Sequence, residues 1–376
     1  MLSRVAAVMA SRTHNRRRVT GSSGRRREGG ESEPQRPNMS RRAFTSAMLL
    51  LLVVMMCCDT GGATATNNGT SRRASLRSSP KTYFFWRDKN EGETVSSLRV
   101  PVLVEMNDDV FAVAEAQCTE TSNSGFAGIA SELLEWTDKE SKELDTTKLR
   151  TQVLEKFQVE QGKFPFLNVT QNASQNRTKV RVSRPTTVVN GSVIYMFAGT
   201  YSFEVTEAAG STAAAAKWGL LVAVGNVSND GSSGKKKIYW KDASVIPWTE
   251  FENQHESLTG LIGGGGSGVQ MKDGTFVFPM EGTKDGKAVS LIIYSSDNAS
   301  GNLSKGMSAD GCSDPSVVEW KGKLMMMTAC DDGRRRVYES GDKGNSWTEA
   351  LGTLSRVWGN NQKRHEKGVG SGFSTA

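Results

Sequence analysis

The chain of 376 residues has a formal net charge of +7 and is 37% hydrophobic, with 5 cysteines. The first 42 residues hold eleven Arg and three Glu, a net of +8, so the other 334 residues carry about −1. The basic character belongs to this leader, which argues against a nucleic-acid-binding body, and the length is sufficient for a large buried core.

Residues 1–65 are predicted to be a basic leader with a secretory signal. Two arginines precede a twelve-residue apolar run, Ala47 to Cys58, and Ala63-Thr64-Ala65 follows as a cleavage site. The run is short for a membrane span, which needs ~20 residues. The long basic region leaves two alternatives, a start at Met39 or an uncleaved anchor. We expect cleavage, and a secreted or cell-surface protein.

Downstream sequons support this location. Eight Asn-x-Ser/Thr triplets behind a signal favour a glycoprotein. The expected glycosylation sites are Asn68, Asn168, Asn172, Asn176, Asn190, Asn226, Asn298 and Asn302.

The cysteines limit the disulfide chemistry. Only Cys118, Cys312 and Cys330 follow the leader. An odd number of three allows at most one internal disulfide and leaves one thiol, which excludes a small fold held together by disulfides. The sequence leaves the pairing open.

The remaining chain divides into a disordered spacer, residues 66–82, and one folded region, residues 83–376. The folded region has short β-branched and aromatic runs separated by turn residues, which predicts an all-β fold. One short helix is expected around Thr147 to Phe157. The glycine run Gly263 to Gly268 is expected to be a flexible connection, since it lacks the lysine and the strand-to-helix context of a phosphate-binding loop.

A weak repeat favours a propeller among the all-β folds. Pro101, Pro185 and Pro315 each precede a strand, a short turn and a second strand, and a fourth copy around Val269 lacks the proline. The copies indicate about four blades. Their turns are expected at Asn107-Asp108-Asp109, Asn190-Gly191, Asp273-Gly274 and Lys321-Gly322.

The segment from Ser340 to Trp347 reads Ser-Gly-Asp-Lys-Gly-Asn-Ser-Trp. It matches the Asp-box pattern found at turns of sialidase-type β-propellers. In such a turn Asp342 accepts bonds from backbone N–H groups, and Gly344 takes a left-handed conformation. We therefore expect Ser340, Asp342, Gly344 and Trp347 to build a hairpin turn, a structural feature without a catalytic role.

Further motifs make the resemblance specific. Leu98-Arg99-Val100-Pro101 resembles Phe-Arg-Ile-Pro of the trypanosomal trans-sialidase superfamily, and Gly311 to Pro315 resembles its Gly-Cys-Ser-Glu-Pro. Leu351 to Gly359 is similar to the sequence after the family's last Asp-box. The resemblance covers about residues 83–376 and implies a sialidase-like six-bladed β-propeller, here incomplete with about four blades.

The resemblance also implies a catalytic scheme. Sialidases use a Tyr nucleophile, a Glu that activates it, an Asp acid/base and three Arg that bind the sugar carboxylate. Arg99 matches the first of these Arg, and Asp314 falls where the activating Glu is expected. Arg184 stands where the family has an Asp near the substrate and is a second candidate for carboxylate or glycan binding. The Tyr and the third Arg would lie beyond Ala376.

Other positions depart from the family pattern. Ser124 occupies the acid/base position, Cys118 the position of a substrate-binding Arg, and Ala329 that of the second carboxylate Arg. A serine hydroxyl is no general acid near neutral pH, and losing a positioned proton donor removes ~10²–10⁴ in rate. The sequence therefore predicts a catalytically inactive member.

The expected role is adhesion, glycan binding or antigenic display, with sialylated glycans or host-cell surface glycoproteins as partners. No cofactor, metal or nucleic acid is expected, and a membrane would be reached only through an uncleaved signal or a missing C-terminal anchor. Two alternatives stay open: an active exo-α-sialidase or trans-sialidase, and a non-functional truncated fragment.

Overall fold

The described part of the chain is built almost wholly of antiparallel strands. The computed structural model describes residues 81–120, 124–134, 145–146, 149–159, 177–203, 217–231, 234–295, 301–352 and 354–359. The predicted leader and spacer lie outside the described residues, as do the sequons at Asn68, Asn168, Asn172, Asn176 and Asn298. The prediction of an all-β fold is confirmed.

The first sheet has six strands in the order β1-β5-β4-β3-β2, with β6 also paired to β5. The second sheet has the order β10-β9-β8-β7. The bounds are β1 Lys81–Asp88, β2 Glu93–Met106, β3 Asp109–Glu120, β4 Gly125–Leu134, β5 Arg150–Val159, β6 Thr178–Lys179, β7 Thr186–Asn190, β8 Val193–Ser202, β9 Trp218–Asn229 and β10 Lys236–Pro247.

A single turn of helix leads from the second sheet into the third. The third sheet has the order β11-β13-β14-β15, with β12 paired to β13, and the fourth has the order β16-β17-β18-β19. The bounds are α3 Thr249–Glu252, β11 Leu258–Gly263, β12 Val269–Gln270, β13 Phe276–Lys284, β14 Lys287–Ser295, β15 Asn302–Leu303, β16 Cys312–Trp320, β17 Lys323–Cys330, β18 Arg335–Ser340 and β19 Thr348–Glu349.

Local turn chemistry explains the hairpins. Asn107 and Asp108 join β2 to β3 with φ of 51° and 66°, and Lys321 and Gly322 join β16 to β17 with φ of 50° and 77°. Two consecutive residues with positive φ form the tight turn whose twist suits a hairpin, and Asn, Asp and Gly accept that conformation most readily. The predicted pairs of strands around all four turns are confirmed.

The helix expected at Thr147 to Phe157 is wrong. Residues 150–159 form β5, which lies between β1 and β4 in the first sheet. Val153 and Leu154 are fully buried on opposite faces of this strand. Pairing with two distant strands therefore overrides the local helix preference of Leu, Glu and Lys, as tertiary contacts commonly do.

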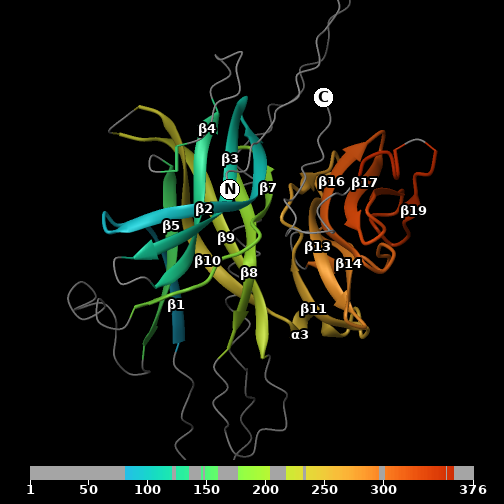
Figure 1. Ribbon diagram of the computed structural model, residues 1–376, viewed down its shortest axis with the longest axis horizontal. Helices are drawn as coiled ribbons and strands as arrows, with labels where there is room; N and C mark the ends of the chain where they lie inside the picture. The colour runs from blue at the N-terminus through green and yellow to red at the C-terminus, as the bar shows by residue number, and fades with distance from the viewer. Residues whose placement is uncertain are drawn as a thin grey trace, which may run out of the picture. The chain divides into compact units, whose positions relative to one another are not determined.

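Apolar side chains fill the spaces between neighbouring sheets. One core joins the first and second sheets and includes Phe111, Leu154, Ile194 and Trp240. The second and third sheets meet through edge-to-face ring pairs, such as Phe197 with Phe278 at 4.9 Å. Another core joins the third and fourth sheets, whose strands β13, β14, β16 and β17 lie side by side (Figure 1).

The innermost strands bring the sheets into one propeller. Strand β2 contacts β7, β7 contacts β12 and β13, and β13 contacts β16, so each sheet meets the next along its first strands. The four sheets are four blades of a β-propeller. We call them blades one to four in chain order.

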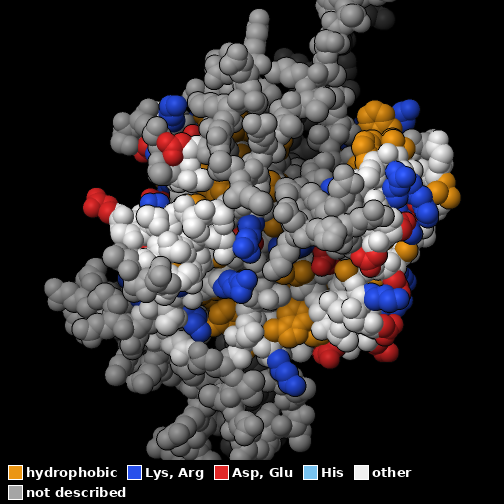
Figure 2. All heavy atoms as spheres, in the orientation of Figure 1, with side chains coloured by type: hydrophobic (Ala, Val, Ile, Leu, Met, Phe, Trp, Pro, Cys, Tyr) orange, Lys and Arg blue, Asp and Glu red, His pale blue; other side chains and the backbone are white. Residues whose placement is uncertain are grey.

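The surface shows charges of both signs. On the face drawn in Figure 2, Lys and Arg side chains are interspersed with Asp and Glu, without one continuous basic band among the described residues there. In the described part of the chain, no helix has the length and hydrophobicity to cross a membrane.

Candidate functional site

In every blade a left-handed residue lies within the innermost strand or next to it, and we call these four positions the interruptions. These residues are Val100, Arg184, Gly265 and Asp314, with φ of 48°, 48°, 73° and 53°. Three of them precede a proline, and non-glycine residues seldom adopt positive φ. The ladder shifts at the same places, between Arg99 and Val102 in blade one and between Ser313 and Ser316 in blade four. Such strained positions cluster at functional sites, so the search for a site starts here.

Three charged side chains from different blades meet at these interruptions, and we call Arg184, Glu281 and Asp314 the axial cluster. Arg184 Nη2 lies 2.9 Å from Glu281 Oε2, and Arg184 Nη1 lies 2.9 Å from Asp314 Oδ1. Arg184 Nε donates to the carbonyl oxygen of Gly263 (2.9 Å), and Nη2 donates to that of Gly264 (2.8 Å). The guanidinium is thus bound by acceptors of the chain itself.

Carboxylates also hold the backbone at two of the interruptions. Glu115 on β3 accepts the N–H of Arg184 at 2.9 Å, and Glu281 on β13 accepts the N–H of Asp314 at 3.0 Å. In each case a Glu of one blade bonds to the left-handed residue of the next. Blades one and two, and blades three and four, are therefore joined by the same device.

A second guanidinium lies near Asp314. Arg335 on β18 pairs with Ala329 on β17, so their side chains share one face of blade four. Burial lowers the pKa of the Arg335 guanidinium, and the nearby charge of Asp314 opposes this shift. Asp314 therefore interacts electrostatically with Arg335 as well as with its ion-pair partner Arg184.

Arg99 differs from Arg184 in its surroundings. It lies on β2 opposite Glu115, and its side chain is exposed. Its side chain forms no ion pair or hydrogen bond with another residue that the structure describes. Of the two arginines predicted to bind a ligand carboxylate, Arg99 is the one whose guanidinium faces solvent, whereas that of Arg184 is held by Glu281 and Asp314.

The position predicted for the acid/base residue holds an exposed hydroxyl. Ser124 lies between β3 and β4, and its Oγ donates to Glu120 Oε2 at 3.2 Å. The other oxygen of Glu120 is ion-paired with Lys179 Nζ. Both oxygens of Glu120 are thus bound by neighbouring side chains of the chain itself.

The other two positions at which the sequence departs from the family pattern, Cys118 and Ala329, are buried. Cys118 is 1% exposed and Ala329 is 4% exposed. Burial raises the pKa of the Cys118 thiol, so this group stays protonated at neutral pH and is a poor nucleophile. Neither position presents a charged group to a ligand.

The glycine run of blade three is a packed part of the centre. Gly263 to Gly266 are buried, and a Cβ on Gly264 would lie 2.8 Å from the carbonyl oxygen of Pro315. The hydroxyl of Thr186 accepts the N–H of Gly265 at 2.9 Å. The predicted flexible connection is therefore wrong: the glycines are required because backbone of blades two and four approaches too closely for side chains.

The Asp-box forms the predicted turn between β18 and β19. Ser340 Oγ accepts the N–H of Gly344 at 2.8 Å, and Asp342 Oδ1 accepts that of Ser346 at 2.9 Å. The hydroxyl and backbone N–H of Ser346, with the Ser340 hydroxyl, lower the pKa of Asp342 to about 2. Gly344 has φ of 83°, and Trp347 packs against the core between blades three and four.

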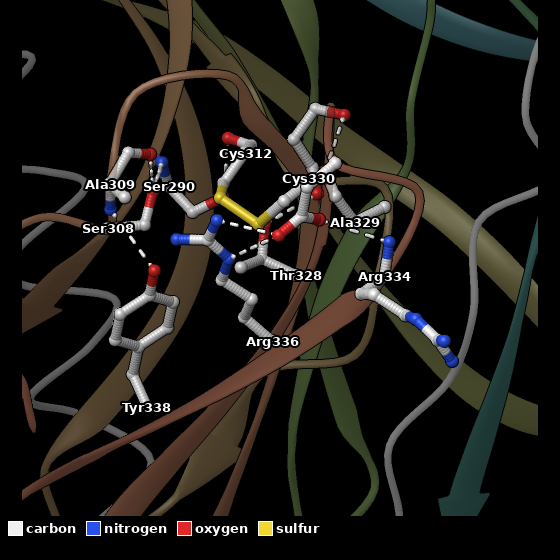
Figure 3. Close-up of a disulfide and its surroundings, with 12 residues drawn as sticks. Ser290, Ser308, Ala309, Cys312, Thr328, Ala329, Cys330, Arg334, Arg336 and Tyr338 are labelled. Carbon is white, nitrogen blue, oxygen red and sulfur yellow. Dashed lines mark hydrogen bonds and ion pairs between the residues drawn. A yellow bond between two sulfur atoms is a disulfide. The ribbon is translucent and has the colours of Figure 1, made fainter. Parts of the chain in front are cut away.

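A disulfide joins β16, the strand that carries Asp314, to β17. Cys312 and Cys330 face each other in the β16–β17 ladder and are joined, while Cys118 is free. Figure 3 shows Arg336 next to the disulfide and the side chain of Arg334 pointing away from it. The prediction of one disulfide and one remaining thiol is confirmed. Among the described residues, no group of three or more His, Cys, Asp or Glu is arranged to hold a metal ion.

Comparison with known proteins identifies the family to which this chain belongs. The BNR repeat-like domain family matches residues 100–376. The chain belongs to this family, within the sialidase superfamily. This sialidase-superfamily chain is 34% identical over 226 residues to a sialidase of Trypanosoma cruzi, and 38% identical over 181 residues to sialidase 85-1.1 of the same organism. The matches cover 58% and 47% of this chain, but only 19% and 24% of those relatives.

Similar solved structures come from the same superfamily. Trypanosoma rangeli sialidase in complex with sialic acid is 27% identical, with a TM-score of 0.48. The match covers 70% of this sialidase-superfamily chain and 39% of that one.

Sequence reasoning missed three residues of the centre: Glu115, Glu281 and Arg335. The first two are carboxylates among mostly apolar neighbours in the middle of β3 and β13, each of which pairs with the innermost strand of its blade. That placement was a usable signal, because an isolated charge in a buried strand needs a partner.

Proposed function

We propose that this chain is a non-catalytic, surface-displayed or secreted glycoprotein of the sialidase superfamily that acts by binding. One observation carries the proposal. The guanidinium of Arg184 is already ion-paired with two carboxylates of the chain, those of Glu281 and Asp314. A ligand carboxylate would have to displace a carboxylate of the chain to reach Arg184, and Ser124 supplies no proton for bond cleavage.

Adhesion or antigenic display through glycans is the role we favour. The predicted leader and sequons support a location on or outside the cell. Sialylated glycans or host-cell surface glycoproteins are the partners proposed, because Arg99 keeps an exposed guanidinium and guanidinium groups pair well with carboxylates.

An active exo-α-sialidase or trans-sialidase is the second candidate. The observation that favours it is the identity of 34% and 38% to two proteins named as sialidases.

The test uses the full chain secreted from a eukaryotic host. We expect no release of free sialic acid from a fluorogenic sialoside, and weak binding of sialyl-lactose measured by calorimetry. Arg99→Ala should weaken that binding about tenfold or more, since charge-assisted bonds contribute ~1.5–3 kcal/mol.

The control is Arg334→Ala, an exposed arginine whose side chain points away from the disulfide region. It should leave binding unchanged. Turnover of the sialoside would establish the second candidate, and equal loss of binding in both variants would remove Arg99 from the proposal.

A further inference from the structure

The acceptors around Arg184 form a complete site for a planar cation. Two are carbonyl oxygens, of Gly263 and Gly264, and two are carboxylate oxygens, of Glu281 and Asp314. All four belong to blades three and four, whereas Arg184 belongs to blade two. The hydrogen-bond donors therefore come from blade two, and all four acceptors come from blades three and four.

The acceptors are held in place without the help of Arg184. Glu281 Oε2 accepts the N–H of Asp314, and the hydroxyl of Ser313 donates to Asp314 Oδ2 at 3.0 Å. The N–H of Gly264 bonds to the carbonyl oxygen of Pro279 at 2.9 Å. These bonds lie within blades three and four, so the acceptor set is preorganised for its occupant.

The geometry of this set matches a guanidinium better than an ammonium ion. Nε, Nη1 and Nη2 each find an acceptor between 2.8 and 2.9 Å. Arginine presents such donors in a rigid planar fork, whereas a lysine ammonium is a compact point charge. The side chains of Arg184, Glu281 and Asp314 are 22%, 22% and 21% exposed, so solvent and small solutes reach the site.

We propose that blades three and four form a guanidinium-binding site that Arg184 of blade two occupies in cis. This goes beyond the proposed loss of catalysis, since it gives the centre of the propeller a ligand class of its own, a guanidinium-type cation. It also makes Arg184 the positioning residue that ties blade two to blades three and four.

The test replaces the internal occupant with a soluble one. Arg184→Ala is titrated with methylguanidinium at constant ionic strength, by calorimetry and thermal shift. We expect saturable binding near the millimolar range and a rise in melting temperature, with methylammonium at least about tenfold weaker. Wild-type protein should show neither effect because its site is filled.

A matched variant identifies the acceptors. Arg184→Ala combined with Glu281→Gln should lose the methylguanidinium response. Absence of saturable binding to folded Arg184→Ala, or an equal response to methylammonium, would overturn the proposal.

If Arg184→Ala does not fold alone, its refolding in methylguanidinium but not in methylammonium supports the proposal. The melting temperature of Arg184→Lys is a second, independent test. Lysine keeps the charge but lacks the fork, so we expect a lower melting temperature than wild type. An unchanged melting temperature in Arg184→Lys would show that any cation suffices, and the guanidinium site would be abandoned. None of these measurements depends on sialoside binding or turnover.

Discussion

At the scale of single residues, the Glu93 carboxylate of blade one is bound by three neighbouring residues. Both its oxygens accept bonds of 2.7 Å from Arg87, the N–H of Asn90 donates to it, and Lys179 lies at 3.0 Å. The carboxylate is only 3% exposed. A buried charge with this many donors is stable because its lone pairs are satisfied, and removing the charge leaves its partners uncompensated.

We predict that Glu93→Gln lowers the free energy of unfolding by roughly 3 kcal/mol. Chemical denaturation measures the loss. Glu105→Gln is the control, an exposed Glu on the same strand that forms no bond with another described residue, and it should stay within about 0.5 kcal/mol of wild type. A similar loss in both variants would contradict the special role of Glu93.

The same residue predicts a pH dependence. Burial would raise the pKa of the Glu93 carboxyl, but the bonds from Arg87, Asn90 and Lys179 outweigh burial and lower it to about 2. The unfolded pKa is ~4.3. The folded value is the lower one, so the stabilisation is complete above ~4.3 and is lost as the pH falls toward 2. Between those values wild type should lose more stability than Glu93→Gln.

At the scale of elements, the innermost strand of blade three is defined by glycine. In the other blades the left-handed residue of this strand region precedes a proline, whereas in blade three it is Gly265, within Gly263 to Gly268. In blade three, carbonyl oxygens of both neighbouring blades lie near the Cβ positions: that of Arg184 is 3.0 Å from the position on Gly263, and that of Pro315 is 2.8 Å from the position on Gly266. A side chain would therefore push the neighbouring blades apart.

Gly264→Ala should lower the free energy of unfolding by roughly 1–3 kcal/mol, because its Cβ would meet two backbone oxygens and Pro315. Gly231→Ala is matched to it, since neither glycine has positive φ and no atom lies within 4 Å of the Gly231 Cβ position. Denaturant unfolding of both variants measures the two free energies of unfolding, and we expect the loss in Gly264→Ala alone. Equal stabilities would restore the idea of a flexible connection.

Local and distant interactions explain what the sequence could and could not predict. The hairpins at Asn107 and Lys321 and the Asp-box turn at Asp342 depend on residues within a few positions, so the sequence identifies them. Strand β5 depends on pairing with β1, some 70 residues away, and the local pattern suggested a helix instead. The axial cluster joins residues up to 130 apart, so Arg184 was predicted as a ligand contact without its partners Glu281 and Asp314.

At the scale of the whole molecule, the sequons at Asn190 and Asn226 differ in how accessible their side chains are to a glycan. Asn190 lies at the end of β7 beside the hairpin turn, whereas the amide oxygen of Asn226 is buried within β9. Glycans are bulky and solvated, so a glycan is compatible with the first position and not with the second.

We therefore expect folded, secreted protein to carry a glycan at Asn190 and none at Asn226. Peptide mass spectrometry after enzymatic deglycosylation in heavy-oxygen water reads each site separately. Occupancy at Asn226 in protein that melts cooperatively would contradict the burial of this strand.

The cysteine arrangement has a practical consequence for physical studies. After the leader, two sulfurs are joined to each other and the third is shielded inside blade one. In protein prepared without residues 1–65, a cysteine engineered on the surface would thus be the only accessible thiol for a maleimide dye among the residues that the structure describes. Fluorescence energy transfer or tethering to a bead would then report on a chosen blade without prior mutation of Cys118.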